Sequence, residues 1–341
     1  MSSNRKNFVA LNIAKGIIIW FAVILHAKDF FNESVRAFDN INSWLYLVIN
    51  PFFYMASGFG MIYAYRTRIQ GIGFFSFMWK RIKKIYPMYL ITTIIMLLFT
   101  IKAEGIGAIK LLDVVQNLLL MTSGWFRNIV PYNIPAWFFS VLMLMYVLFW
   151  AVERIFKGND VYAYIVLAIA GLFLLTKRFN IPFLYYEDGL GLLSFSIGTL
   201  IGIFYIKHCN GKNGELVNVM AAIIVTLLAV VAIKFIPSDI KYRFSEHIFT
   251  LFIAPTVLLW VVTGILNKVA SGVTILDKAF GTITMNVFLW HLIIVRVYNA
   301  LCLKIGIYDL IGMKAAYIIY LIVTFITCHL ITTAENRIMN K

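Results

Sequence analysis

Long apolar stretches separated by short polar segments follow one another along the whole chain. A helix that crosses a membrane needs about 20 mostly apolar residues, and ten stretches come close to this requirement. They cover residues 8–27, 43–65, 85–101, 137–154, 161–176, 190–207, 216–236, 247–266, 281–301 and 315–333. The pattern therefore predicts an all-α fold: a polytopic membrane bundle of about ten transmembrane helices that forms a single domain over residues 1–341.

Two connections between these stretches are longer than the others, residues 66–84 and residues 102–136. Within the second, residues 109–122 (IKLLDVVQNLLLMT) place Leu and Val at helical spacing. This spacing predicts an amphipathic helix that lies at the membrane interface or dips part-way into it.

The composition agrees with a membrane protein. The chain is 62% hydrophobic and 13% charged, whereas soluble domains are about a quarter charged. Its three cysteines are scattered and predict neither a disulfide framework nor a metal site. The net charge of +15 is better explained by loops that set the topology and contact anionic lipid than by nucleic-acid binding.

The distribution of basic residues predicts the sidedness. If the N-terminus is inside, the cytoplasmic segments carry most of the Lys and Arg, and residues 66–84 alone hold six basic residues and no acid. The positive-inside rule then favours both termini in the cytoplasm, with the 28–42 and 102–136 loops outside. The first apolar run lacks a small-residue cleavage site after it, so we expect a retained span of the cell membrane.

Lys15 and His26 stand in the first apolar run, eleven residues apart. Eleven residues at 100° each return to within about 20° of the starting face, with a rise of about 16 Å. Ionisable residues inside a membrane usually face a cavity. The alternative is that Lys15 reaches the inner headgroups and His26 lies at the outer interface. Asp29, one turn later, either fixes the tautomer of His26 or is an ordinary loop carboxylate.

Two further motifs allow a plain and a functional interpretation. In PFFYMASGFGM, residues 51–61, Ser57 and Gly58 permit close helix packing, or let an elongated ligand pass near the backbone. In WKRIKKIYPMY, residues 79–89, four basic residues set the topology and contact lipid, or bind a polyphosphorylated cytoplasmic ligand. His291 lies inside the ninth predicted span, where its cost in lipid predicts that it faces the bundle.

These motifs, in this order, resemble the acyltransferase-3 family of polytopic membrane acyltransferases. Lys15-Gly16 followed by His26 has the spacing of the family's Arg-Gly…His, with Lys in place of Arg. FFYMASGF resembles FFxxSGF with one extra residue, and KRIKKIYPMY resembles RRxxRIxPxY. Residues 135–137 (PAW) and the region of His291 resemble two later family elements. The acidic residue that many members carry after the PAW element is missing, since residues 138–146 contain no carboxylate.

The resemblance implies transfer of an acyl group, commonly acetyl, from cytoplasmic acyl-CoA to a hydroxyl of a cell-surface glycan or lipid-linked sugar. No metal and no nucleic acid is implied. The implied catalytic residues are His26 as general base, Lys15, and His291 as a possible second base. The donor is expected to contact six residues: Lys80, Arg81, Lys84, Tyr89, Ser57 and Gly58.

Two other functional classes compete with this interpretation. A transporter or flippase for an anionic or lipid-linked substrate would explain the intramembrane charges equally well. Transporters often show internal repeats, and no repeat is evident in this sequence. A catalytically inactive structural membrane protein has no positive support from the residues.

Overall fold

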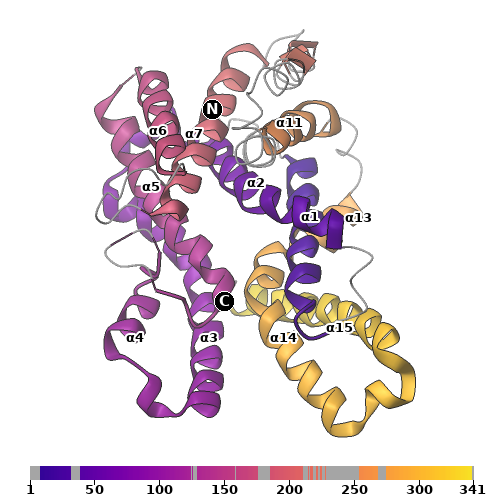
Figure 1. Cartoon of the computed structure of the whole chain (residues 1–341). Coiled ribbons are helices and arrows are strands. Elements are labelled where there is room, and N and C mark those ends of the chain that lie inside the picture. The colour runs from indigo at the N-terminus through magenta and orange to yellow at the C-terminus, as the bar shows by residue number, and fades with distance from the viewer. Residues whose placement is uncertain are drawn as a thin grey trace, which may run out of the picture.

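The computed structural model describes residues 8–31, 39–123, 125, 129–157, 159–175, 185–209, 253–267 and 274–339, with single positions between 214 and 227 (Figure 1). Within these ranges every regular element is a helix. The elements are α1 (Val9–Ala27), α2 (Asp39–Tyr65), α3 (Phe74–Glu104), α4 (Leu111–Leu118), α5 (Trp137–Ile155), α6 (Asp160–Leu175), α7 (Tyr186–His208), α11 (Ala254–Val261), α13 (Thr274–Leu276), α14 (Thr284–Ile305) and α15 (Ile307–Met339).

Six helical segments of the described chain are long and apolar enough to cross a membrane. They are Val9–Ala27, Phe74–Glu104, Ile134–Ile155, Tyr186–His208, Thr274–Ile305 and Ile307–Ile338. Shorter apolar helices cover Asp160–Leu175 and Ala254–Gly264. The all-α multi-pass architecture agrees with the sequence. The count of ten spans stays a prediction, because most of the expected span at 216–236 falls outside the described residues.

The sequence predicts a connection over residues 66–84, but the loop in the structure is shorter than this segment. After a 3-10 turn at Ile69–Gly71, helix α3 begins at Phe74 and continues unbroken to Glu104. Phe77, Met78 and Ile85 are buried on one side of its first turns, so this part of the helix already packs against the bundle. The basic cluster therefore stands on a helix of fixed geometry and not on an open loop.

The predicted amphipathic helix within 109–122 is present as α4, and its two faces are reversed relative to a soluble helix. Leu111, Leu112 and Val115 are exposed, whereas Gln116 and Asn117 are buried. Soluble proteins rarely expose such a contiguous apolar face, so the helix is suited to contact with lipid. Its depth in a membrane stays a prediction.

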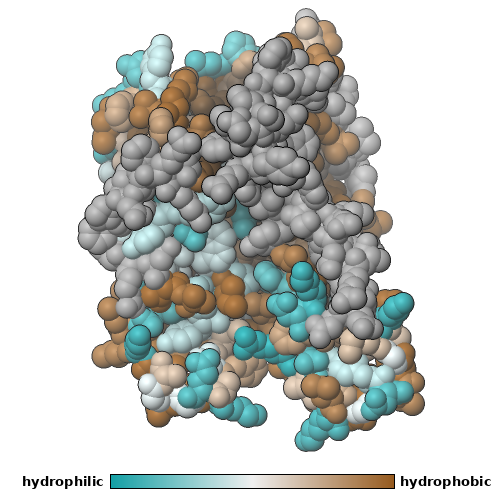
Figure 2. Space-filling model, viewed as in Figure 1, coloured by the Kyte–Doolittle hydropathy of each residue, from teal (hydrophilic) through white to brown (hydrophobic). Residues whose placement is uncertain are grey.

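Large apolar side chains are also exposed along the long helices. Leu98 of α3, Val166 of α6 and Leu330 of α15 each expose more than half of their surface. Figure 2 shows such apolar residues on the surface of the described part of this face, with hydrophilic residues towards its upper and lower edges. Exposure of this kind is the pattern of helices that lipid surrounds.

Glycines set the closest helix contacts of the bundle. A side chain at Gly58 of α2 would collide with the Phe195 carbonyl oxygen of α7, and one at Gly198 of α7 would collide with the Met55 backbone of α2. A side chain at Gly16 of α1 would likewise collide with Phe280, which lies in a π-helical turn at Asp277–Gly281. Small residues let helix backbones approach in this way within membranes.

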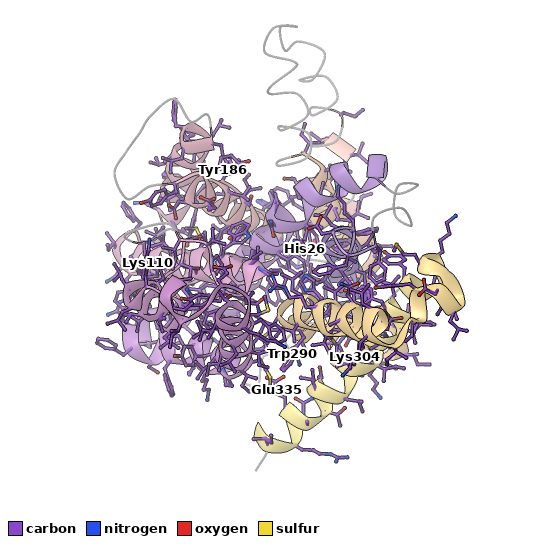
Figure 3. The ribbon with its side chains drawn as sticks, turned by 60° about the horizontal axis from the view of Figure 1, so that its bottom comes forward. His26, Lys110, Tyr186, Trp290, Lys304 and Glu335 are labelled. Atoms are coloured by element: carbon purple, nitrogen blue, oxygen red, sulfur yellow. The ribbon has the colours of Figure 1, made fainter. Side chains whose placement is uncertain are left out.

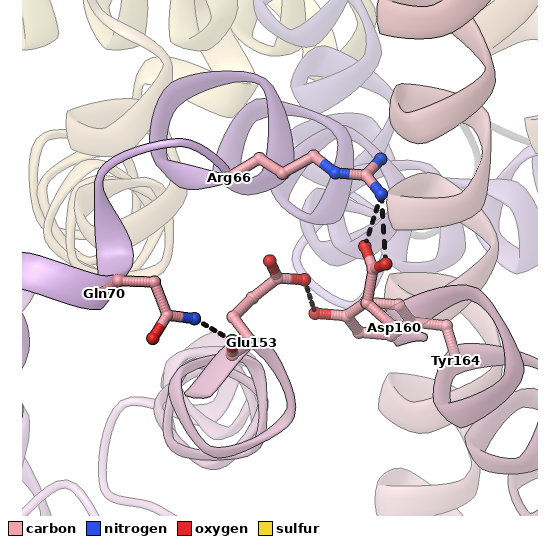
Figure 4. A network of polar contacts seen from close by, with 5 residues as sticks. All are labelled: Arg66, Gln70, Glu153, Asp160 and Tyr164. Atoms are coloured by element: carbon pink, nitrogen blue, oxygen red, sulfur yellow. Dashed lines mark hydrogen bonds and ion pairs between the residues drawn. The ribbon is translucent and has the colours of Figure 1, made fainter. Parts of the chain in front are cut away.

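A polar network joins the end of α2 to α5 and α6 (Figure 4). Arg66 Nη2 donates to Asp160 Oδ1 at 3.0 Å and lies 2.9 Å from Asp160 Oδ2 as an ion pair. The Tyr164 hydroxyl donates to Glu153 Oε1 at 2.9 Å, and Gln70 Nε2 donates to the Glu153 carbonyl at 2.6 Å. The network holds the turn between α2 and α3 against the bundle, away from the site described next.

Candidate active site

Two histidines from opposite ends of the chain meet between α1 and α14. His26 Nδ1 lies 2.8 Å from His291 Nε2, and the two rings stack with centroids 5.0 Å apart and an interplanar angle of 16°. His291 is buried and His26 is half-buried. Figure 3 shows His26 near the middle of the bundle. The sequence marked both residues as candidate bases but contained no sign that they touch.

The hydrogen bonds of this pair determine which nitrogen of each ring is free. His291 Nδ1 lies 2.9 Å from the Val287 carbonyl oxygen, which can only accept, so Nδ1 carries the proton. Nε2 of the neutral His291 ring is then an acceptor, and His26 Nδ1 must donate to it. We infer that His26 Nε2 carries an unshared lone pair, as a general base requires. By the same inference His291 has the tautomer-fixing role considered for Asp29, which is exposed and close enough to His26 to interact with it electrostatically.

A cavity of about 600 Å³ begins one turn before this pair on α14. One end lies among helix termini, at Asn12 of α1 and Glu335 of α15. The other end is aromatic, with Phe138, Phe139 and Phe288 in its wall. Phe288 precedes His291 by three residues, or about 4.5 Å of helix rise. The aromatic end therefore approaches the histidine pair.

Three cations from two helices line the cavity: Lys15, Arg81 and Lys84. Lys15 is half-buried and lies close enough to Lys84 and Asp277 to interact electrostatically with both. Ser57 of α2 lines the same cavity and donates to the Phe53 carbonyl at 2.8 Å. The structure thus brings together Lys15, expected to be catalytic, and three of the six residues that were expected to contact the donor.

Arg81 is the cation best prepared to receive an anion. Its guanidinium lies 4.6 Å from the centroid of the Tyr65 ring and 5.9 Å from that of Tyr146. Its Nε and Nη2 atoms are buried and have no hydrogen-bond partner among the described residues. Burying an N–H group without an acceptor costs free energy. A ligand oxygen in the cavity would supply the missing acceptor.

Three residues that the sequence assigned to the donor do not line this cavity. Lys80 is exposed on α3. Tyr89 is fully buried, and its hydroxyl donates to the Asn117 carbonyl of α4. Gly58 is used for the contact of α2 with α7. Their proposed contacts with a ligand stay predictions.

Sequence reasoning missed one side of the cavity, which α14 and α15 supply. Asn286 and Glu335 are buried polar residues in apolar helices, and both line the cavity. A buried amide and carboxylate in predicted spans are a usable signal, but their pairing depends on contacts between helices. No group of three or more His, Cys, Asp or Glu that could hold a metal occurs in the part of the chain that the structure describes.

Almost the whole chain matches the model of one known protein family. Residues 8–333 match the family model of acyltransferase-3, described as an acyltransferase domain. No curated protein and no solved structure matches the chain.

Proposed function

The chain belongs to the acyltransferase-3 family, and from this premise we propose that it moves an acyl group from acyl-CoA in the cytoplasm to a hydroxyl of an extracytoplasmic glycan or glycoconjugate. The acyl group proposed is acetyl. One observation carries the proposal: a cavity lined by cations lies next to a histidine that has a free Nε2. Helices α1 and α14 contribute residues to both the cavity and the histidine pair.

The donor would enter at the cavity end formed by helix termini, which the predicted topology places at the cytoplasm. Its phosphates would meet Arg81, Lys84 and Lys15, of which Arg81 offers unpaired N–H donors. Charge-assisted bonds of this type are roughly twice as strong as neutral ones. The thioester end would then lie against the aromatic wall, next to the histidine pair.

The reaction needs one base. As the acceptor oxygen attacks the thioester carbonyl carbon, its proton passes to His26 Nε2 and the carbon–sulfur bond breaks. The thiolate that leaves takes up the proton from His26 Nε2, so the products are an acyl ester and free CoA and His26 is neutral again. His291 Nε2 accepts the hydrogen bond from His26 Nδ1 throughout and holds the ring in position. A positioned base contributes about 10²–10⁴-fold to such a step.

The test uses inside-out membrane vesicles that contain the protein and the cell's own glycans. Acetyl-CoA labelled in the acetyl group is added to the outer, cytoplasmic face. We expect alkali-labile label on luminal glycan with wild type, and none with His26→Gln. Labelled acetyl-CoA found intact in the lumen, without covalent label, would instead identify a transporter.

A further inference from the structure

One wall of the cavity offers acceptor oxygens, opposite in character to its three cations. Asp277, Asn286 and Glu335 all line the cavity. Asp277 Oδ1 and Asn286 Oδ1 are buried and have no hydrogen-bond partner among the described residues. Within this acceptor wall, Asp277 lies close enough to Lys15 to interact with it electrostatically. Asn286 and Glu335 have no use in binding phosphate, so they need a different explanation.

The orientation of Asn286 follows from its neighbours. Its Nδ2 donates to Thr332 Oγ1 and to Glu335 Oε2, both at 2.9 Å. Thr332 has already given its proton to the Cys328 carbonyl, at 2.8 Å, so it can only accept from Asn286. Both partners are thus acceptors, which fixes the amide nitrogen towards them and turns Asn286 Oδ1 away.

This chain of hydrogen bonds holds Glu335 in place but brings no positive charge to it. The side chain is 8% exposed, and no cation in the described part of the chain forms an ion pair with it. Its Oε2 receives one hydrogen bond from Asn286, which leaves the carboxylate with further acceptor capacity. A buried carboxylate in this state is stabilised by a ligand that brings N–H donors.

We propose that Glu335, positioned by Asn286, binds the adenine ring of the acyl-CoA donor through the exocyclic amine. This amine carries two N–H donors on one atom, which suits a wall whose open groups are acceptors. The amides of the pantetheine arm each pair an N–H with a carbonyl, which suits this wall less well. Glu335 also lies at the polar end of the cavity, so the nucleotide there leaves the thioester at the aromatic end.

The inference rests on the proposed function, and a binding experiment separates the two. The wild-type protein in detergent is titrated with CoA and with its deaminated analogue, in which hypoxanthine replaces adenine. Where adenine has its exocyclic amine the analogue has a carbonyl oxygen, and its single N–H donor on this edge is shifted to N1. We therefore expect the analogue to bind about tenfold more weakly. Equal affinity for both would overturn the adenine subsite, whereas failure of CoA itself to bind would overturn the proposed function.

A variant sharpens the test. Gln at 335 can keep the bond from Asn286 on its oxygen and turn its own N–H₂ towards the base, so Glu335→Gln should remove the preference for CoA over the analogue. Its affinity for 4′-phosphopantetheine, which has no adenine, should not change. Thr333→Ala, an exposed position on α15 outside the cavity, is the control and should keep the wild-type preference. Unchanged discrimination in Glu335→Gln would also overturn the proposal.

Discussion

At the scale of single residues, the proposed mechanism gives the two histidines separate tasks. In it, His26 offers Nε2 to the substrate, and His291 holds the ring by accepting a hydrogen bond from Nδ1. Glutamine at 26 keeps similar bulk but cannot take the hydroxyl proton. His26→Gln should therefore insert and bind acyl-CoA normally but lose acyl transfer by about 10²–10⁴-fold. Transfer rate and donor affinity, measured on the same preparation, check this result.

Two substitutions at His291 test whether this residue acts as a hydrogen-bond acceptor for His26. Gln at 291 can still accept from His26, whereas Leu cannot, so His291→Gln should retain more transfer than His291→Leu. If His291→Gln abolishes transfer while His26→Gln keeps it, the base lies on the other helix. If both variants transfer normally, neither histidine is the base.

Arg81 should contribute to donor affinity, because two of its buried nitrogen atoms have no acceptor within the described structure. Arg81→Ala should weaken acyl-CoA binding by about 1.5–3 kcal/mol, the value of a hydrogen bond to a charged group. Raised salt should reproduce part of the loss. Lys83→Ala removes an exposed charge from the same helix and serves as the control. An affinity equal to wild type, with altered membrane orientation, would show that Arg81 is only a topology signal.

The residues also show where a sequence pattern stops being informative. Spacing along one helix placed Lys15 and His26 on one face, and the resemblance assigned Ser57, Arg81 and Lys84 to one ligand. All three line the cavity together with Lys15. The sequence could not predict that Glu335 lies in the same cavity, because its position depends on how the last helix packs against α14. Spacing within a helix is readable from sequence, whereas contacts between distant helices are not.

At the scale of elements, the pairing of α2 with α7 depends on the absence of a side chain at Gly58. Gly58→Ala would push the new methyl group into the Phe195 carbonyl, while Gly60→Ala meets nothing within 4 Å. Both changes bring the same gain in helix propensity. Thermal unfolding in detergent should show Gly58→Ala less stable than Gly60→Ala by about 1–3 kcal/mol. Equal stability would mean that the two helices separate easily.

The helices themselves were largely predictable, because an apolar run of sufficient length is a local property. The start of α3 was not, since residues 74–84 read as a charged loop by composition. The helix forms because its buried side, with Phe77 and Met78, packs against the bundle. Its basic side faces outward or into the cavity.

At the scale of the whole molecule, the mechanism requires a defined sidedness. With the three native cysteines replaced, all of which are buried, a Cys at Ser34 should react with an impermeant reagent in intact cells. A Cys at Ser76, exposed on α3, should react only after the membrane is opened. Ser34 lies outside the described residues, so the loop assignment rests on the positive-inside rule. The reverse pattern would exclude a donor site open to the cytoplasm.

The contact between His26 and His291 joins positions 265 residues apart. A ribosome completes α1 early and α14 near the end of synthesis. A nascent chain therefore holds His26 without the partner that sets its tautomer. Under the proposed mechanism, the base becomes competent only when almost the entire polypeptide has been made and inserted, so an unfinished chain would not consume the acyl donor.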